Sequence, residues 1–160
     1  MVTTVDSGIS RTGSTTYVYL ISIVAAVSGL LFGFDIAVIN GAIIFLRDQF
    51  GLSGFQTEVA TSSLLIGCVA GASIAGFLSD RFGRRRILIL SALLFAASAV
   101  GAALPRNLLE FVAARFIGGI AIGVASVLAP IYIAEVAPPR IRGRLVSLNQ
   151  MAIVSGILLA

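Results

Sequence analysis

Long apolar stretches separated by short polar segments dominate this 160-residue chain. Four complete apolar stretches cover approximately residues 17–45, 57–79, 87–104 and 108–136, and a fifth begins at residue 145. About 20 helical residues are needed to cross the roughly 30 Å hydrocarbon core of a bilayer. The pattern therefore predicts an all-α membrane protein with four complete transmembrane helices and part of a fifth.

The two ends of the chain give further expectations. Residues 1–16 are rich in serine, threonine and glycine, which predicts a disordered tail before the helical bundle of residues 17–160. The last apolar run reaches Ala160 without a polar flank. A helix ending inside hydrocarbon would leave backbone carbonyls unpaired, so we expect the chain to be a fragment of a longer protein.

Composition supports a membrane protein and argues against several other classes. Hydrophobic residues make up 58% of the chain and charged residues only 11%. All eleven basic residues are arginine and there is no histidine, so we expect neither a histidine metal site nor a histidine proton relay. No metal-ligand cluster or nucleophile-and-base arrangement is present, which argues against an enzyme and a bound cofactor.

The arginines indicate how the chain crosses the membrane. Arg47 and Arg106 are the only basic residues in two of the loops, whereas the two alternate loops, 80–86 and 138–144, are rich in arginine. Cytoplasmic loops carry an excess of basic residues, so we expect both arginine-rich loops and the N-terminus to be cytoplasmic. This distribution explains the net charge of +4 without a nucleic-acid partner.

One arginine-rich loop carries a specific motif. Residues 76–86 read GFLSDRFGRRR, with an aspartate, a glycine and consecutive arginines in fixed order. This segment resembles the loop between the second and third spans of the major facilitator superfamily of secondary transporters. The resemblance implies the N-terminal half of a twelve-span fold, completed by a C-terminal bundle that is absent here.

Two charged residues lie deep within the predicted spans, far from their ends. Asp35 lies about ten residues, roughly 15 Å, from the outer end of the first span, and Arg115 about seven residues, roughly 10 Å, from that of the fourth. An isolated charge at such depth costs several kcal/mol, so we expect the two to pair. The pair could be a static salt bridge that fixes helix packing, or a titratable pair that couples a proton to a conformational change.

The same two spans are rich in glycine. Transporters of this superfamily repeat a three-helix unit with inverted topology, so the first and fourth spans are structural counterparts. Glycines interrupt both apolar stretches, and the fourth also contains Pro130, which indicates a central binding site, although G-x3-G spacing also favours close helix packing.

A second set of charged residues is expected at the cytoplasmic face, at the inner ends of the spans. It could be a solvated surface that only sets orientation, because exposed ion pairs contribute about 0–1 kcal/mol each. It could instead be a gate network that holds the outward-facing state and breaks as the inside opens. The residues of this predicted network are Asp80, Arg84, Arg85, Glu135 and Arg142.

Three further segments narrow the resemblance. GLLFGFDIAVINGA (29–42), RFIGGIAIG (115–123) and PIYIAEVAPPRIRG (130–143) are similar to motifs of the sugar porter family. The resemblance implies that Asp35 marks a proton-coupled member, and that Phe32 and Gln150 contact sugar. Phe34 departs from the tyrosine that is more common before the aspartate, which puts a hydroxyl contact there in doubt.

The family resemblance thus implies a secondary active transporter in the cell membrane. We expect it to import a monosaccharide or related polyol by proton symport through alternating access, with one pathway per monomeric chain. The proton is then the coupling ion, with Asp35 and Arg115 as the coupling pair. A passive sugar facilitator and a transporter-like sugar sensor remain alternatives.

Overall fold

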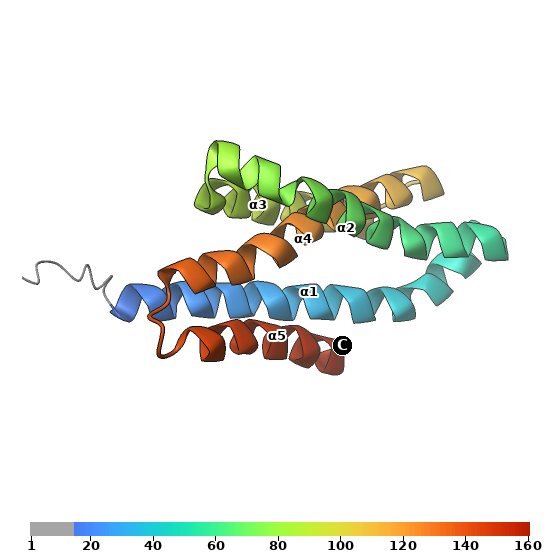
Figure 1. The fold of residues 1–160 in the computed structure, drawn as a ribbon. Coiled ribbons are helices and arrows are strands. Elements are labelled where there is room, and N and C mark those ends of the chain that lie inside the picture. Colours follow the sequence, from blue (N-terminus) through green and yellow to red (C-terminus); the bar gives the residue numbers. More distant parts are fainter. Residues whose placement is uncertain (1–14) are drawn as a thin grey trace, which may run out of the picture.

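The computed structural model describes residues 15–160, without the side chains of residues 15–22, 24, 25 and 49. The described part is all-helical, as predicted (Figure 1). Its helices are α1 (Thr15–Phe50), α2 (Gly54–Phe82), α3 (Arg84–Ala103), α4 (Leu108–Val136) and α5 (Arg142–Leu159). Thr15 and Thr16 already belong to α1, and the rest of the predicted tail lies outside the described residues.

Four segments of the described chain are long and apolar enough to cross a membrane, which confirms the prediction of four complete spans. They are Ala26–Asp48, Gly54–Phe82, Arg84–Ala103 and Leu108–Val136. The helices extend beyond most of the predicted apolar runs, because polar residues continue or cap a helix where it leaves the hydrocarbon.

Two helices begin with side-chain caps. At α2, Ser53 Oγ accepts a hydrogen bond from Gln56 N at 3.3 Å, and Gln56 Oε1 accepts one from Ser53 N at 2.9 Å. At α4, Asn107 Oδ1 accepts one from Glu110 N at 2.8 Å. These bonds satisfy backbone donors that the first helical turn leaves free.

A single residue, Gly83, separates α2 from α3. Its φ of +88° lies in a region that side chains disfavour, so glycine suits this turn. Its N–H donates to Ser79 O at 2.9 Å, and its carbonyl accepts from Ile87 N at 3.2 Å. The turn therefore closes one helix and opens the next without a loop.

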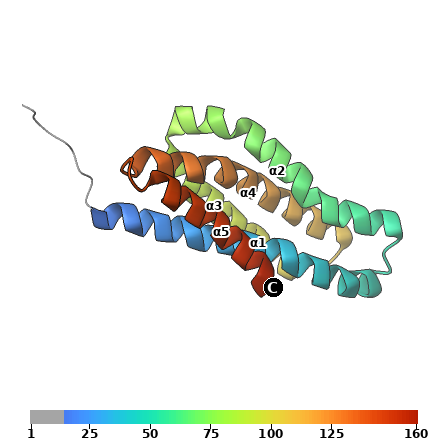
Figure 2. The same ribbon diagram turned by 60° about the horizontal axis from the view of Figure 1, so that its bottom comes forward.

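The helices form two groups. α4 packs mainly against α2 and α3, whereas α1 packs mainly against α5, and fewer contacts join the groups (Figures 1 and 2). The start of α1, the α2–α3 turn and the α4–α5 link lie at one end of the bundle, which we call the arginine-rich end. The α1–α2 and α3–α4 links lie at the opposite end.

Glycines bring α2 and α4 into close contact. A Cβ on Gly67 or Gly71 of α2 would collide with the backbone of α4, at the carbonyls of Phe116 and Ile120. Reciprocally, a Cβ on Gly119 of α4 would collide with the backbone of α2. Without a hydrophobic driving force between helices in lipid, such small residues favour association through close van der Waals packing.

Glycines also bring α1 and α5 into close contact. A Cβ on Gly33 of α1 would meet the backbone of Ile153 in α5, and one on Gly156 of α5 would meet the backbone of Leu30 in α1. Both α1 and α4 are continuous helices, and α4 runs through Pro130 without a break. The glycines therefore leave both helices unbroken, and Gly33 and Gly119 serve the close packing that the G-x3-G spacing predicts.

Candidate functional site

The two charged residues that lie deep within the spans, Asp35 and Arg115, meet between the helix groups. Arg115 Nη1 of α4 donates to both Asp35 Oδ1 and Oδ2 of α1, at 2.9 Å each. The side chain of Arg115 is 6% exposed and that of Asp35 is 23% exposed. The predicted pairing is confirmed, and the ion pair joins the α1–α5 group to the group centred on α4.

A single guanidinium nitrogen of Arg115, Nη1, makes both hydrogen bonds to Asp35. The Nε of Arg115 is buried and has no hydrogen-bond partner among residues 15–160. Arginine does not lose its proton in proteins, so Arg115 stays charged whatever the state of its partner. Among the described residues, Asp35 is the one carboxylate paired with it, so protonation of Asp35 would leave a buried cation without a counter-charge.

The predicted sugar contacts lie on the α1–α5 pair. Phe32 is half-buried on α1, one turn before Asp35, so the two side chains share a side of the helix. Gln150 is exposed on α5. The structure thus places the two residues on neighbouring helices, and their contact with sugar stays a prediction.

Sequence reasoning missed a buried polar residue beside Gln150. Asn149 is buried on α5, and a Cβ on Gly29 of α1 would lie 2.9 Å from its Oδ1. The carboxamide of Asn149 therefore packs over Gly29 where α5 contacts α1. The sequence feature that could have indicated this buried residue is an asparagine followed by a glutamine at the start of an apolar run.

Part of the predicted cytoplasmic network is formed. Arg84 Nε, at the start of α3, lies 2.8 Å from Glu135 Oε1, near the end of α4, and the two side chains are 38% and 44% exposed. Asp80, Arg85 and Arg142 are exposed at the same end, and no ion pair joins them to another residue of the described chain. The structure therefore brings together two of the five predicted residues.

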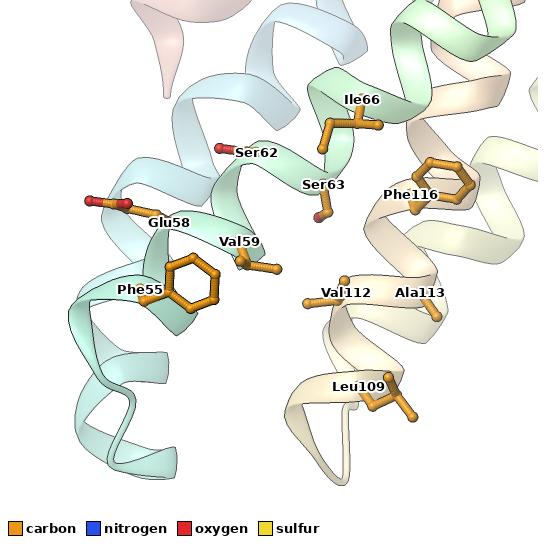
Figure 3. Close-up of a pocket in the computed structure, with 10 residues that line it drawn as sticks. All are labelled: Phe55, Glu58, Val59, Ser62, Ser63, Ile66, Leu109, Val112, Ala113 and Phe116. Carbon is orange, nitrogen blue, oxygen red and sulfur yellow. The ribbon is translucent and has the colours of Figure 1, made fainter.

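A groove of about 560 Å³ lies between α2 and α4 toward the opposite end, and the sequence did not predict it (Figure 3). Val59 of α2 and Val112 of α4 point towards one another across it, and Phe55 and Phe116 also line it. Glu58, Ser62 and Ser63 are its polar lining residues. A sugar site needs several convergent polar groups, which this mostly apolar groove does not offer.

Comparison with known proteins matches the family described as sugar (and other) transporter over residues 21–160. The chain is 51% identical over 149 residues to an arabinose-proton symporter from Bacillus subtilis, and 50% identical over 149 residues to a glucose transport protein from Synechocystis. Each alignment covers 93% of this chain and 32% of the relative, so the chain spans about a third of the length of these proteins.

The fold comparison agrees with the sequence comparison. A solved structure of the major facilitator superfamily proton:xylose symporter XylE matches with a TM-score of 0.83 at 42% identity. The match covers 91% of this chain and 36% of that structure. The fold is therefore the N-terminal part of a major facilitator transporter. The chain belongs to the sugar porter family of this superfamily, a family of membrane transporters and not of enzymes.

Proposed function

We propose that the chain is the N-terminal part of a transporter that imports a monosaccharide or related polyol together with a proton. The observation that carries this proposal is the ion pair between Asp35 and Arg115, buried between two helix groups within the membrane spans. The arabinose-proton and proton:xylose symporters similar to this chain support it.

The pair offers a route from protonation to movement. While Asp35 is ionised, its carboxylate neutralises Arg115 and ties α1 to α4. A proton on Asp35 removes the negative charge and weakens both charge-assisted hydrogen bonds, so the buried guanidinium needs another acceptor. The α1–α5 group can then shift against the group centred on α4, which changes the access to the site.

Two residues of the neighbouring helices α1 and α5 are the proposed substrate contacts. We propose that Phe32 forms an apolar wall for the sugar ring and that Gln150 donates and accepts hydrogen bonds with its hydroxyls. The C-terminal bundle, a region beyond this chain, supplies the remaining polar contacts. Each chain then forms one pathway as a monomer.

The arginine-rich end completes the proposed cycle. With the N-terminus and both arginine-rich loops in the cytoplasm, the Arg84–Glu135 pair lies at the inner face and stabilises the outward-facing state. Asp80, Arg85 and Arg142 join this gate network when the inside closes fully. Opening of the inside separates these charges.

The decisive experiment measures sugar-dependent proton uptake in vesicles that contain the full-length protein. Arabinose, xylose, glucose and a polyol are tested as substrates, and sugar counterflow is measured in parallel. We expect Asp35→Asn to abolish proton uptake and to retain counterflow. Asp48→Asn is the matched control, because this exposed aspartate lies at the far end of the same helix.

The same assays separate the alternatives. If the unaltered protein moves sugar without protons, it is a passive facilitator and the ion pair is structural. If it binds sugar without counterflow, it is a sensor rather than a transporter. Loss of counterflow in Asp35→Asn, with Asp48→Asn unaffected, would assign Asp35 to the transport cycle itself rather than to proton coupling alone.

A further inference from the structure

The two closely packed helix pairs, α2–α4 and α1–α5, share one contact pattern. A Cβ on Gly119 of α4 would meet the carbonyl of Leu64 in α2, and a Cβ on Gly29 of α1 would meet that of Asn149 in α5. In both pairs, the glycine four residues further along faces the residue four positions further along the partner helix. Leu64 and Asn149 therefore occupy equivalent positions in the two pairs.

The contact at Asn149 is the looser of the two. A Cβ on Gly119 would collide with the backbone of Leu64, whereas at Gly29 the carbonyl oxygen and Oδ1 of Asn149 each lie 2.9 Å from the Cβ position. The backbones of α1 and α5 thus approach less closely here, and the carboxamide of Asn149 reaches over the glycine. A polar side chain occupies the space that the wider spacing leaves.

Packing alone does not require a polar side chain at this position, because leucine occupies its equivalent in the α2–α4 pair. Asn149 is only 8% exposed, and its carboxamide forms no hydrogen bond within the described part of the chain. Buried amides are normally hydrogen-bonded, because burying one without a partner is unfavourable. The carboxamide therefore has hydrogen-bonding capacity that residues 15–160 do not use.

The proposed substrate contacts lie on either side of this carboxamide. α1 and α5 run in the same direction from the arginine-rich end (Figure 1). Phe32 follows Gly29 by three residues, about 60° one way round α1, and Gln150 follows Asn149 directly, about 100° the other way round α5. On parallel helices that face each other, these opposite offsets place both side chains on the same side of the contact. The contact of Asn149 with Gly29 lies between them.

We propose that Asn149 is a further sugar-contacting residue, whose carboxamide hydrogen-bonds a hydroxyl of the sugar held between Phe32 and Gln150. The assignment rests on the proposed function, and it adds a residue that selects the substrate. An amide both donates and accepts hydrogen bonds, as a sugar hydroxyl does. A buried group that binds a hydroxyl discriminates against an analogue without it, because the group is then left unpaired.

Sugar binding to the full-length protein in micelles tests this assignment. The probe is whichever of arabinose, xylose and glucose gives the strongest counterflow, together with its monodeoxy analogues. Asn149→Leu introduces the side chain of the equivalent position, and we expect it to weaken binding of the parent sugar by about fivefold, the loss of one hydrogen bond. The analogue that lacks the partner hydroxyl should bind Asn149→Leu and the unaltered protein equally well.

Two further variants make the result specific. Leu64→Ala removes buried side-chain volume at the equivalent position of the other pair, so it should leave the ratio of affinities for the sugar and its analogues unchanged. Asn149→Ala removes the carboxamide without adding a branched side chain, and it replaces Asn149→Leu if circular dichroism shows that the leucine variant does not fold. We expect it to lose the same discrimination between the parent sugar and that one analogue.

Three results would overturn the assignment. Unchanged affinity for the parent sugar in the Asn149 variants would show that the carboxamide does not contact it. Equal losses for the parent sugar and every analogue would assign Asn149 to helix packing alone. Absence of both counterflow and sugar binding in the unaltered protein would refute the proposed function, and this assignment with it, before any variant is compared.

Discussion

Two ion pairs of nearly equal length lie at different depths in this bundle. Asp35 and Arg115 are 2.9 Å apart, with Arg115 buried and Asp35 about a quarter exposed, while Arg84 and Glu135 are 2.8 Å apart with more than a third of each side chain exposed. Length alone therefore says little about what each pair does. Water can replace a lost partner at the exposed pair, but it cannot do so readily at the buried one.

The difference in burial suits the two ion pairs to different tasks. A buried pair makes protonation consequential, because losing one charge leaves the other uncompensated in a medium of low dielectric constant. An exposed pair can separate and re-form at little cost. We call Asp35–Arg115 the deep pair and Arg84–Glu135 the exposed pair. The comparison predicts that variants at the deep pair lower stability most and that variants at the exposed pair lower it least.

Removing the carboxylate of the deep pair should have the largest effect. In Asp35→Asn the guanidinium of Arg115 stays charged, so we expect the free energy of unfolding to fall by about 3 kcal/mol, near the lower limit for breaking a buried pair. Arg115→Gln should cost less, because the remaining carboxyl group can take up a proton. Thermal and denaturant unfolding of the full-length protein in micelles measure both changes.

The double variant Asp35→Asn/Arg115→Gln is the control for this prediction. It leaves no buried charge, so it should recover most of the stability that Asp35→Asn loses. A double variant as unstable as the sum of the two single variants would show that the residues act through packing rather than through their charges.

The sequence predicted the spans and the deep pair for physical reasons. Hydrocarbon thickness fixes the length of an apolar run, and the two opposite charges deep within the spans lay at similar depths. The helix ends were less accurate, because capping residues such as Ser53 are polar and lie beyond the apolar runs. Which charged residues pair at the arginine-rich end was not predictable, since exposed side chains are not positioned by the hydrophobic pattern.

Contacts between helices were only partly predictable. The G-x3-G spacing predicted close packing, but it did not say which helix each glycine would face. The burial of Asn149 against Gly29 and the groove between α2 and α4 both depend on this choice of neighbour. A glycine can loosen a helix or let another one approach, so the sequence alone did not decide between these two roles.

Packing beside the deep pair should have an intermediate effect. Gly33 lies on α1, two residues before Asp35. Gly33→Ala adds a Cβ that meets the backbone of Ile153 in α5. Because a backbone cannot move aside as a side chain can, we expect a loss of about 1–3 kcal/mol in unfolding free energy. The measurement is denaturant unfolding of the full-length protein in micelles.

Gly41→Ala is the matched control for Gly33→Ala, because it lies on the same helix and its added Cβ meets nothing within 4 Å. Alanine favours helix more than glycine does, so this variant should be neutral or more stable by up to about 1 kcal/mol. Equal losses at the two positions would mean that the α1–α5 contact does not contribute to stability as the structure indicates.

The smallest effect should come from the exposed pair. Arg84→Gln, Glu135→Gln and the double variant form a cycle whose coupling energy we expect to be about 0–1 kcal/mol and to decrease at high salt. Arg85→Gln, at a neighbouring exposed arginine without an ion pair in the described chain, should show no coupling with Glu135→Gln. A coupling of several kcal/mol that salt does not change would remove the contrast with the deep pair. Such a strong bond would also be a poor gate, because a contact that breaks in every transport cycle must cost little to break.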